Sequence, residues 1–138
     1  GRIKHFISAF GEHVIGEEVE KALQFALSRH PEVRVTEFTV APQVAVNEGL
    51  PYHEWLVAFE NPPTNPEAFA DDLDQKMRDL NVYYDDLISG NIVRRLVLTP
   101  LPTDAFQRYM KSIGKLGGQN KVPRLANDRK IADELVNV

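Results

Sequence analysis

The stretch Tyr52-His-Glu-Trp-Leu-Val-Ala-Phe59 is the most strand-like part of this 138-residue chain. Successive side chains of a strand point to opposite faces, and both sets are apolar here. One set is Trp55, Val57 and Phe59, and the other is Leu56 and Ala58. Burial on both faces is typical of a strand at the centre of a covered sheet. The sequence therefore predicts that residues 52–59 form the central strand of the fold.

A second strand is predicted over Val33–Val40, before the central one. Its apolar residues change parity between Val35 and Phe38. Such a change predicts either a β-bulge or burial on both faces of the strand. Asn47–Pro51 carries the glycine and proline expected of a hairpin connection between the two strands.

Apolar residues at helical spacing predict helices around this sheet. The predicted helices are 16–29, 66–80, 83–88, 103–113 and 127–138, and the remaining strands are 3–8, 13–15 and 92–99. Thr103 and Asn127 are the expected N-caps of the last two helices. The inward stripes expected of these two helices are Phe106, Tyr109, Met110 and Ile113, and Ile131, Leu135 and Val138. The order β-β-α-β-β-α-α-β-α-α predicts one α+β domain over residues 1–138, a mixed β-sheet packed with helices.

The composition is that of a globular protein, with 43% hydrophobic and 26% charged residues. A net charge of -4 argues against a general nucleic-acid binder, because such domains are usually basic. The apolar runs are shorter than the ~18 residues of a membrane span, and no signal peptide heads the chain. We therefore expect no membrane partner and a cytoplasmic location. The absence of cysteine excludes disulfides and thiolate metal sites.

The polar residues of the predicted helices and strands give little sign of catalysis. The histidines lack the i, i+4 spacing of a helical metal site, so no metal ligands are expected among His5, His13, His30 and His53. The paired aspartates are predicted to lie on the solvent-facing side of amphipathic helices: Asp71, Asp72, Asp74, Asp85 and Asp86. The chain contains neither a GxxxxGK[ST] phosphate loop nor an evident Ser–His–Asp triad.

One loop, Gly114-Lys-Leu-Gly-Gly-Gln-Asn-Lys-Val-Pro-Arg124, is a candidate functional segment. It combines three glycines with three cations, Lys115, Lys121 and Arg124, between two predicted helices. Glycines allow a backbone to take positive φ and to approach a ligand closely. Loops between rigid elements often carry binding and catalytic residues. The alternative interpretation is a solvated connector.

The two ends of the chain resemble the small C-terminal domain of adenylate-forming enzymes. Gly1–Gly11, followed by Glu18-Val19-Glu20, resembles the motif that opens this domain in that superfamily. Asn120–Arg124 resembles the superfamily's G-K-V-D-R segment, whose lysine reaches into the adenylation site. Two such motifs in the right order, more than a hundred residues apart, are far more specific than either alone.

The middle of the chain narrows the resemblance to one family. The pattern is that of the auxin-responsive acyl-acid amido synthetases (the Gretchen Hagen family) and their bacterial relatives. It covers nearly the whole chain and is most specific in the Q-x-K-V-P-R ending. The other positions that carry it are Leu73-Asp74, Leu80-Asn81, Tyr84, Gly90, Phe106, Tyr109-Met110 and Gly114.

The resemblance implies roles for particular residues. Lys121 matches the catalytic lysine, whose ammonium would offset charge at the α-phosphate. Arg2 matches the position near the nucleotide ribose and the interdomain hinge, and Lys4 matches the hinge. Gln119 and Arg124 match positions that hold the loop or touch substrate.

This sequence departs from the family pattern at several of these positions. Asn120 stands where plant members carry an aromatic residue, and Gly117-Gly118 replaces a bulkier pair. Ser8 replaces a lysine found in many acyl-CoA ligases. These departures leave the acceptor open between an amino acid, another amine and a thiol.

The resemblance also implies a function for the whole domain. It would be the C-terminal lid of an ATP-dependent ligase that converts a carboxylic acid to acyl-AMP and transfers it to an amine such as an amino acid. The N-terminal domain of the parent, absent from this chain, would bind the acid, ATP and the accompanying Mg²⁺. The start at Gly1-Arg2 without methionine suggests a piece of a longer protein or a remnant of tag removal, and the isolated domain is expected to be inactive. The alternative is a free-standing α+β module for small-ligand binding or protein interaction.

Overall fold

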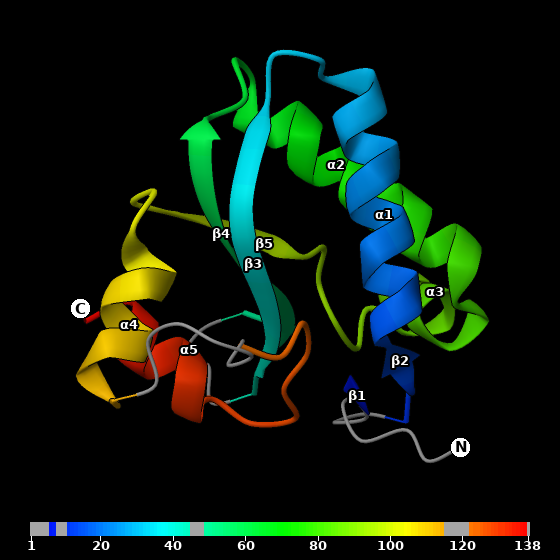
Figure 1. Cartoon of the computed structure of the whole chain (residues 1–138). Coiled ribbons are helices and arrows are strands. Elements are labelled where there is room, and N and C mark those ends of the chain that lie inside the picture. The colour runs from blue at the N-terminus through cyan, green and yellow to red at the C-terminus, as the bar shows by residue number, and fades with distance from the viewer. Residues whose placement is uncertain (1–5, 8–10, 45–48, 115–121, 138) are drawn as a thin grey trace.

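The structure is a computed structural model that describes residues 6–7, 11–44, 49–114 and 122–137 (Figure 1). Its elements follow the predicted order β-β-α-β-β-α-α-β-α-α. The α+β class and the mixed sheet packed with helices are therefore confirmed.

The main sheet has three strands in the order β3-β4-β5 within the described residues. β3 (Arg34–Gln43) pairs antiparallel with β4 (Tyr52–Asn61), and β5 (Val97–Leu101) pairs parallel with β4. β4 is thus the central strand, as predicted. The register of β3 shifts on both sides of Val35, as a bulge would cause, and residues 38–42 are buried in succession, so both alternatives predicted for this strand are observed.

The first two strands form a sheet of their own. β1 (Phe6–Ile7) pairs antiparallel with β2 (Val14–Ile15) in a two-stranded sheet that, among the described residues, is separate from the main sheet. This short ribbon leads directly into α1 (Gly16–Arg29).

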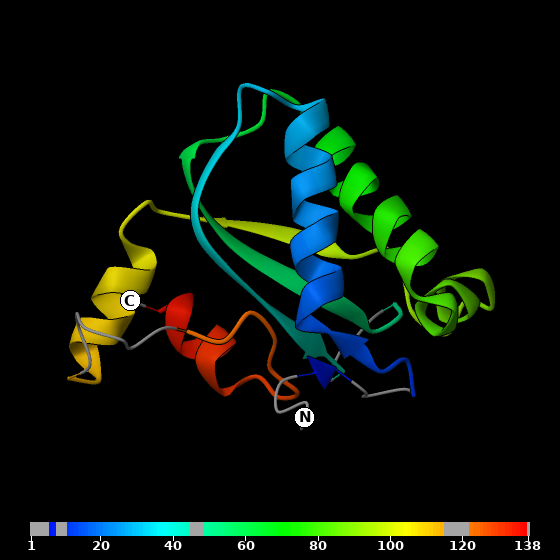
Figure 2. The ribbon, with the colours of Figure 1, turned by 45° about the vertical axis from the view of Figure 1, so that its right-hand side comes forward.

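Helices cover both faces of the main sheet (Figures 1 and 2). α1, α2 (Pro66–Leu80) and α3 (Val82–Ser89) lie on one side, and α4 (Ala105–Ser112) and α5 (Lys130–Leu135) lie on the other. The buried residues divide into two clusters accordingly. The first contains Trp55, Val57 and Phe59 with residues of α1 and α2, and the second contains Leu56 and Ala58 with residues of α4 and α5.

Two asparagines define the boundaries of the middle helices. The side chain of Asn65 accepts a hydrogen bond from the Ala68 amide at 3.1 Å, and Pro66 follows at the first helical position. Asn81 ends α2 and caps α3, because its side-chain oxygen accepts from the Tyr84 amide at 2.9 Å. The predicted break at Asn81 is therefore confirmed, and the same residue starts the next helix.

The strand predicted over 92–99 is displaced, because β5 spans Val97–Leu101. The amides of Ile92 and Val93 donate to the Leu87 carbonyl at 3.0 and 3.3 Å. The Arg94 amide donates to the Pro51 carbonyl at 3.0 Å. Because these amides form hydrogen bonds outside the sheet, the pairing of β5 with β4 begins only after residue 94.

The ends of the last two helices also differ from the prediction. Thr103 does not cap α4, because its hydroxyl donates to the Phe59 carbonyl at 2.8 Å and the helix begins at Ala105. Ile113, expected to point inward, is 42% exposed. α5 begins at Lys130, three residues after Asn127, and Val138 lies outside the described residues. The described helices are each too short or too polar to cross a membrane.

Replacing Leu56 by Ala tests the second core cluster. Leu56 is fully buried on the α4–α5 side of β4, so Leu56→Ala should lower the free energy of unfolding by about 2–5 kcal/mol. Urea denaturation measures this change. Val82→Ala is the control, because Val82 is 61% exposed and should change stability by no more than about 0.5 kcal/mol. Equal effects would contradict the assignment of Leu56 to a packed core.

Candidate functional site

The structure describes only part of the predicted site. Arg124 and the glycine that starts the loop, Gly114, are described, and Gly114 has φ +73°. The other predicted site residues lie outside the described residues: Arg2, Lys4, Gly117, Gly118, Gln119, Asn120 and Lys121. The described part of the predicted loop is the segment that follows Lys121.

Residues 122–126 lie along the free edge of β3. The Val40 amide donates to the Arg124 carbonyl at 2.8 Å, and the Ala126 amide donates to the Val40 carbonyl at 3.0 Å. These bonds form a parallel bridge between Val40 and Leu125. The hydroxyl of Thr39 donates to the Pro123 carbonyl at 2.6 Å. The backbone directly after Lys121 is thus tied to the main sheet.

Side chains of the same segment enter both core clusters. Val122 belongs to the α4–α5 cluster, whereas Leu125 is fully buried in the α1–α2 cluster. Because their burial is on opposite sides of the sheet, the segment cannot slip by one residue along β3 without exposing one of them. The position from which the Lys121 loop departs is therefore well defined.

The side chain of Arg124 turns back onto α1 and β3. Its Nε donates to a carboxylate oxygen of Glu20 at 2.8 Å, and its Nη1 forms an ion pair with Glu37. Its guanidinium carbon lies 4.7 Å from the centroid of the Phe38 ring. We call this group, Arg124 with Glu20, Glu37 and Phe38, the Arg124 anchor.

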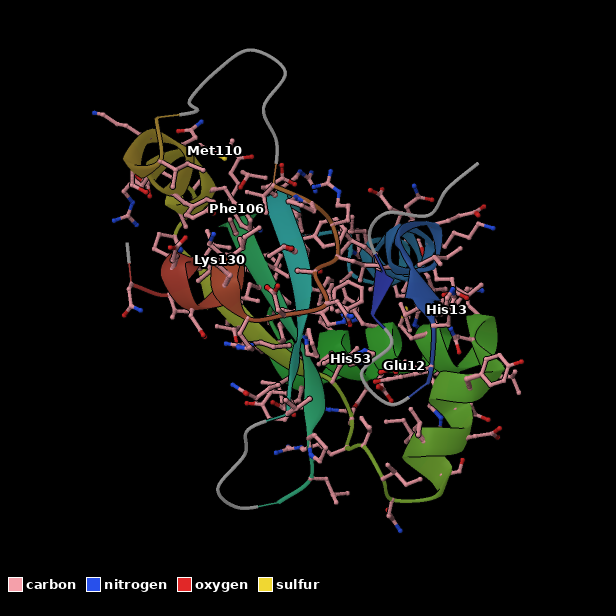
Figure 3. All side chains as sticks on the ribbon, turned by 90° about the horizontal axis from the view of Figure 1, so that it is seen from below. Glu12, His13, His53, Phe106, Met110 and Lys130 are labelled. Carbon is pink, nitrogen blue, oxygen red and sulfur yellow. The ribbon has the colours of Figure 1, made fainter. Side chains whose placement is uncertain are left out.

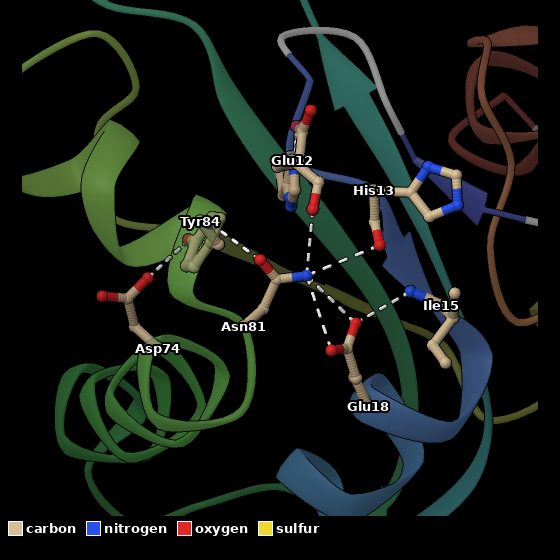
Figure 4. A network of polar contacts seen from close by, with 8 residues as sticks. Glu12, His13, Ile15, Glu18, Asp74, Asn81 and Tyr84 are labelled. Carbon is tan, nitrogen blue, oxygen red and sulfur yellow. Dashed lines mark hydrogen bonds and ion pairs between the residues drawn. The ribbon is translucent and has the colours of Figure 1, made fainter.

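A second polar region lies on the α1–α2 side and joins the β1–β2 ribbon to the α2–α3 junction (Figure 4). The Asn81 amide nitrogen donates to the Glu12 carbonyl at 3.0 Å and to a Glu18 carboxylate oxygen at 3.2 Å. The same Glu18 oxygen accepts from the Ile15 amide at 2.9 Å. Asn81 therefore fixes the start of α1 and the start of α3 together.

Asp74 belongs to the buried side of this region, so its predicted place on the solvent-facing side of α2 is wrong. Its carboxylate accepts from the Tyr84 hydroxyl at 2.6 Å and from the Leu96 amide at 3.2 Å. Burial, and then the Asp74 charge, raise the pKa of Tyr84 well above its usual value. Asp71 and Asp72 do remain on the outer side of α2. Asp71 pairs with Arg95, and Asp72 pairs with Arg29 and His30.

Sequence reasoning also missed a buried pair between Glu12 and His53. His53 Nε2 lies 2.7 Å from a Glu12 carboxylate oxygen, and both side chains are inaccessible to solvent. The His53 ring stacks on Tyr84 with centroids 5.1 Å apart. No local pattern signals this pair, because the partners are 41 residues apart and come from a turn and a strand.

The pocket nearest this region is an open cleft of about 520 Å³. Its lining residues are Gly11, His13, Glu18, Leu80, Asn81, Val82 and Tyr83. Viewed from below, Glu12 and His13 lie on the other side of the main sheet from Phe106, Met110 and Lys130, and His53 lies between them on β4 (Figure 3). Over the described ranges, no group of three or more His, Asp or Glu side chains is placed to hold a metal ion.

The described residues thus form a three-stranded mixed sheet covered by helices on both faces, with residues 122–126 bound along its edge strand. The profile of the GH3 family C-terminal domain matches residues 17–130. The chain therefore belongs to the GH3 family, as a C-terminal domain, and the family resemblance of the sequence is confirmed.

Solved structures of this family share the fold. The chain is similar to a GH3.15 acyl acid amido synthetase, with a TM-score of 0.76 and 16% identity over 99% of this chain. A second structure, AtGH3.15 acyl acid amido synthetase in complex with 2,4-DB, gives a TM-score of 0.74 at 16% identity, also over 99% of this chain. In both cases the chain spans 26% of the length of the matched protein. The search of curated proteins finds no match.

Replacing Asn81 by Asp tests the junction between the ribbon and the helices. The change keeps the acceptor for the Tyr84 amide but removes the donor to Glu12 and adds a carboxylate beside Glu18. An unpaired buried charge should lower the free energy of unfolding by about 3 kcal/mol or more. The control is Asn65→Asp, which keeps an exposed cap and should be neutral or slightly stabilising. Equal free energies of unfolding for the two variants, measured by urea denaturation, would contradict the hydrogen-bond network of Asn81.

Tyr84→Phe tests the raised pKa of Tyr84. Because the pKa of Tyr84 is higher in the folded state, the unfolded chain loses the Tyr84 proton first as the pH rises. The contribution of the protonated hydroxyl to the free energy of unfolding is therefore fully present below about pH 10 and is lost as the pH rises through the folded pKa. Urea denaturation should show that Tyr84→Phe loses about 1–3 kcal/mol at pH 7. Above pH 10 its stability should decline less steeply than that of the original protein. Tyr83→Phe, at an exposed neighbour, should keep the original pH dependence, and a parallel curve for Tyr84→Phe would exclude the effect.

Proposed function

We propose that this chain is the lid domain of an ATP-dependent acyl-acid amido synthetase. The GH3 family membership supports the class of enzyme. The observation that carries the site assignment is the docking of residues 122–126 on β3, because it gives the loop bearing Lys121 a rigid base. Lids of this kind complete an active site by closing over a larger domain.

The proposed reaction has two steps. A carboxylate oxygen of the acid attacks the α-phosphate of ATP, which forms acyl-AMP and releases pyrophosphate. An amine, such as that of an amino acid, then attacks the acyl carbonyl, loses a proton and displaces AMP. The ammonium of Lys121 would stabilise the charge that develops during the first step. A compact charge on a flexible stem suits this task.

The other partners are assigned to the parent protein. The N-terminal domain of the parent would bind ATP, its Mg²⁺ and the carboxylic acid, as the similarity to acyl acid amido synthetases implies. Arg2 and Lys4 would act at the nucleotide and the hinge, and Gln119 beside the catalytic lysine. Substrate profiling of the parent with carboxylic acids, amines and thiols distinguishes the possible substrates.

Lys121→Ala in the two-domain parent tests the proposal. Loss of a charge that acts in the transition state should slow ATP–pyrophosphate exchange by about 10²–10³-fold. Lys115→Ala, another cation of the same loop, is the matched control and should retain most of the exchange activity. Undiminished exchange in the Lys121 variant would refute the catalytic role.

The second candidate function is a self-contained module that binds a small ligand. The cleft of about 520 Å³ beside Asn81 is the observation that favours it, because polar and apolar side chains meet there. This function would leave Lys121 as a solvated cation, so retained exchange after Lys121→Ala would shift the search to ligands of the cleft.

A further inference from the structure

We propose that Glu20 and Glu37 are positioning residues that act through Arg124 to hold the base of the Lys121 loop on β3. The inference rests on the proposed function of Lys121 for its catalytic consequence, and on the described contacts for the anchor itself. It assigns Arg124 to positioning, and not to substrate contact.

The anchor joins three distant parts of the chain. Arg124 is separated from Glu20 by 104 residues and from Glu37 by 87. Glu20 belongs to α1, Glu37 to β3, and Arg124 stands three positions after Lys121. The guanidinium therefore links the exit of the loop to a helix and to the edge strand at once.

The geometry is preorganised on the Glu37 side. The Glu37 oxygen that contacts Arg124 also accepts from the Phe38 amide at 3.1 Å, which fixes the carboxylate against its own strand. Glu37 follows the register shift after Val35, and bulges of this kind redirect side chains. The Phe38 ring lies under the guanidinium plane and limits its movement.

Burial separates this group from ordinary surface ion pairs. The side chains of Arg124, Glu20 and Glu37 are 35%, 45% and 23% exposed, so the pairs are partly shielded from water. Isolated exposed pairs contribute little to stability. Here the guanidinium of Arg124 contacts two carboxylates and an aromatic ring. A guanidinium is planar and has several N–H donors, so it can bind two carboxylates at once.

The backbone contacts explain why the anchor affects position. Val40 and Thr39 hold the carbonyls of Arg124 and Pro123. These bonds fix the segment along the strand, whereas the side chain of Arg124 restrains its rotation about the strand axis. Catalytic groups lose much of their effect when displaced by about 1 Å. Loosening this anchor should therefore reduce catalysis before it affects nucleotide binding.

The kinetic test uses the two-domain parent with Glu20→Gln, Glu37→Gln, Arg124→Gln and Arg124→Lys. We expect kcat of ATP–pyrophosphate exchange to fall by about 10–10²-fold in Arg124→Gln, with KM for ATP nearly unchanged. Arg124→Lys should recover part of the rate, because it keeps the charge but loses the fork. Glu17→Gln, at an exposed position of the same helix paired with Lys21, is the control and should behave as the original enzyme.

A double-mutant cycle tests whether these residues act together. Glu37→Gln combined with Arg124→Gln should lower kcat no further than Arg124→Gln alone, because residues in one network are not additive. If the reductions in kcat of the two single variants multiply in the double variant, Glu37 acts independently of Arg124 and the inference is overturned.

Amide hydrogen exchange of the 138-residue chain tests the anchor without any assumption about catalysis. The Val40 and Ala126 amides, which bond across the bridge, should exchange faster in Glu37→Gln and Arg124→Gln than in Glu17→Gln. Unchanged exchange would overturn the anchor. Faster exchange with an unchanged kcat, in an enzyme that Lys121→Ala inactivates, would overturn the positioning role while leaving the proposed function intact. Full activity of Lys121→Ala would instead reject the proposed function, and with it any catalytic consequence of the anchor.

Discussion

The fold depends on one strand that is buried on both faces. β4 pairs with β3 on one edge and β5 on the other, so its backbone groups are satisfied within the sheet. Its two sets of side chains then require separate covers. α1 and α2 supply one cover, and α4 and α5 supply the other. Residues 122–126, which follow Lys121 in the sequence, bind along the outer edge of β3 and contribute Val122 to the second cluster.

The two glutamates of the Glu18-Val19-Glu20 motif connect the N-terminal part of α1 to two other parts of the structure. Glu18 holds the turn before α1 through the Ile15 amide and Asn81. Glu20, one position beyond Val19, faces the other way and meets Arg124. Val19 between them is fully buried. One short acidic motif thus stabilises the start of the domain and, in our proposal, the base of the catalytic loop.

Much of the architecture was predictable because it depends on local patterns. The boundaries of α1 and α2, the break at Asn81 and the bulge of β3 follow from side-chain periodicity and capping, and the structure agrees with each. The start of β5 and of α4 was not predictable, because distant carbonyls of Pro51 and Phe59 bind the preceding residues. Asp74 was misplaced for the same reason, since Tyr84 and Leu96 turn an aspartate of an amphipathic helix into a buried acceptor.

The sequence by itself determined the order of elements, the central strand and the family, because periodicity and short motifs are properties of neighbouring residues. The candidate loop and its lysine are also predictions from the sequence. Only the tertiary structure decided which side chains meet: Glu12 with His53, Asn81 with Glu18, and Arg124 with both Glu20 and Glu37. These partners are separated by 41 to 104 residues, and nothing local to either member specifies the other. Such pairs form only when packing of the sheet and helices brings their backbones together.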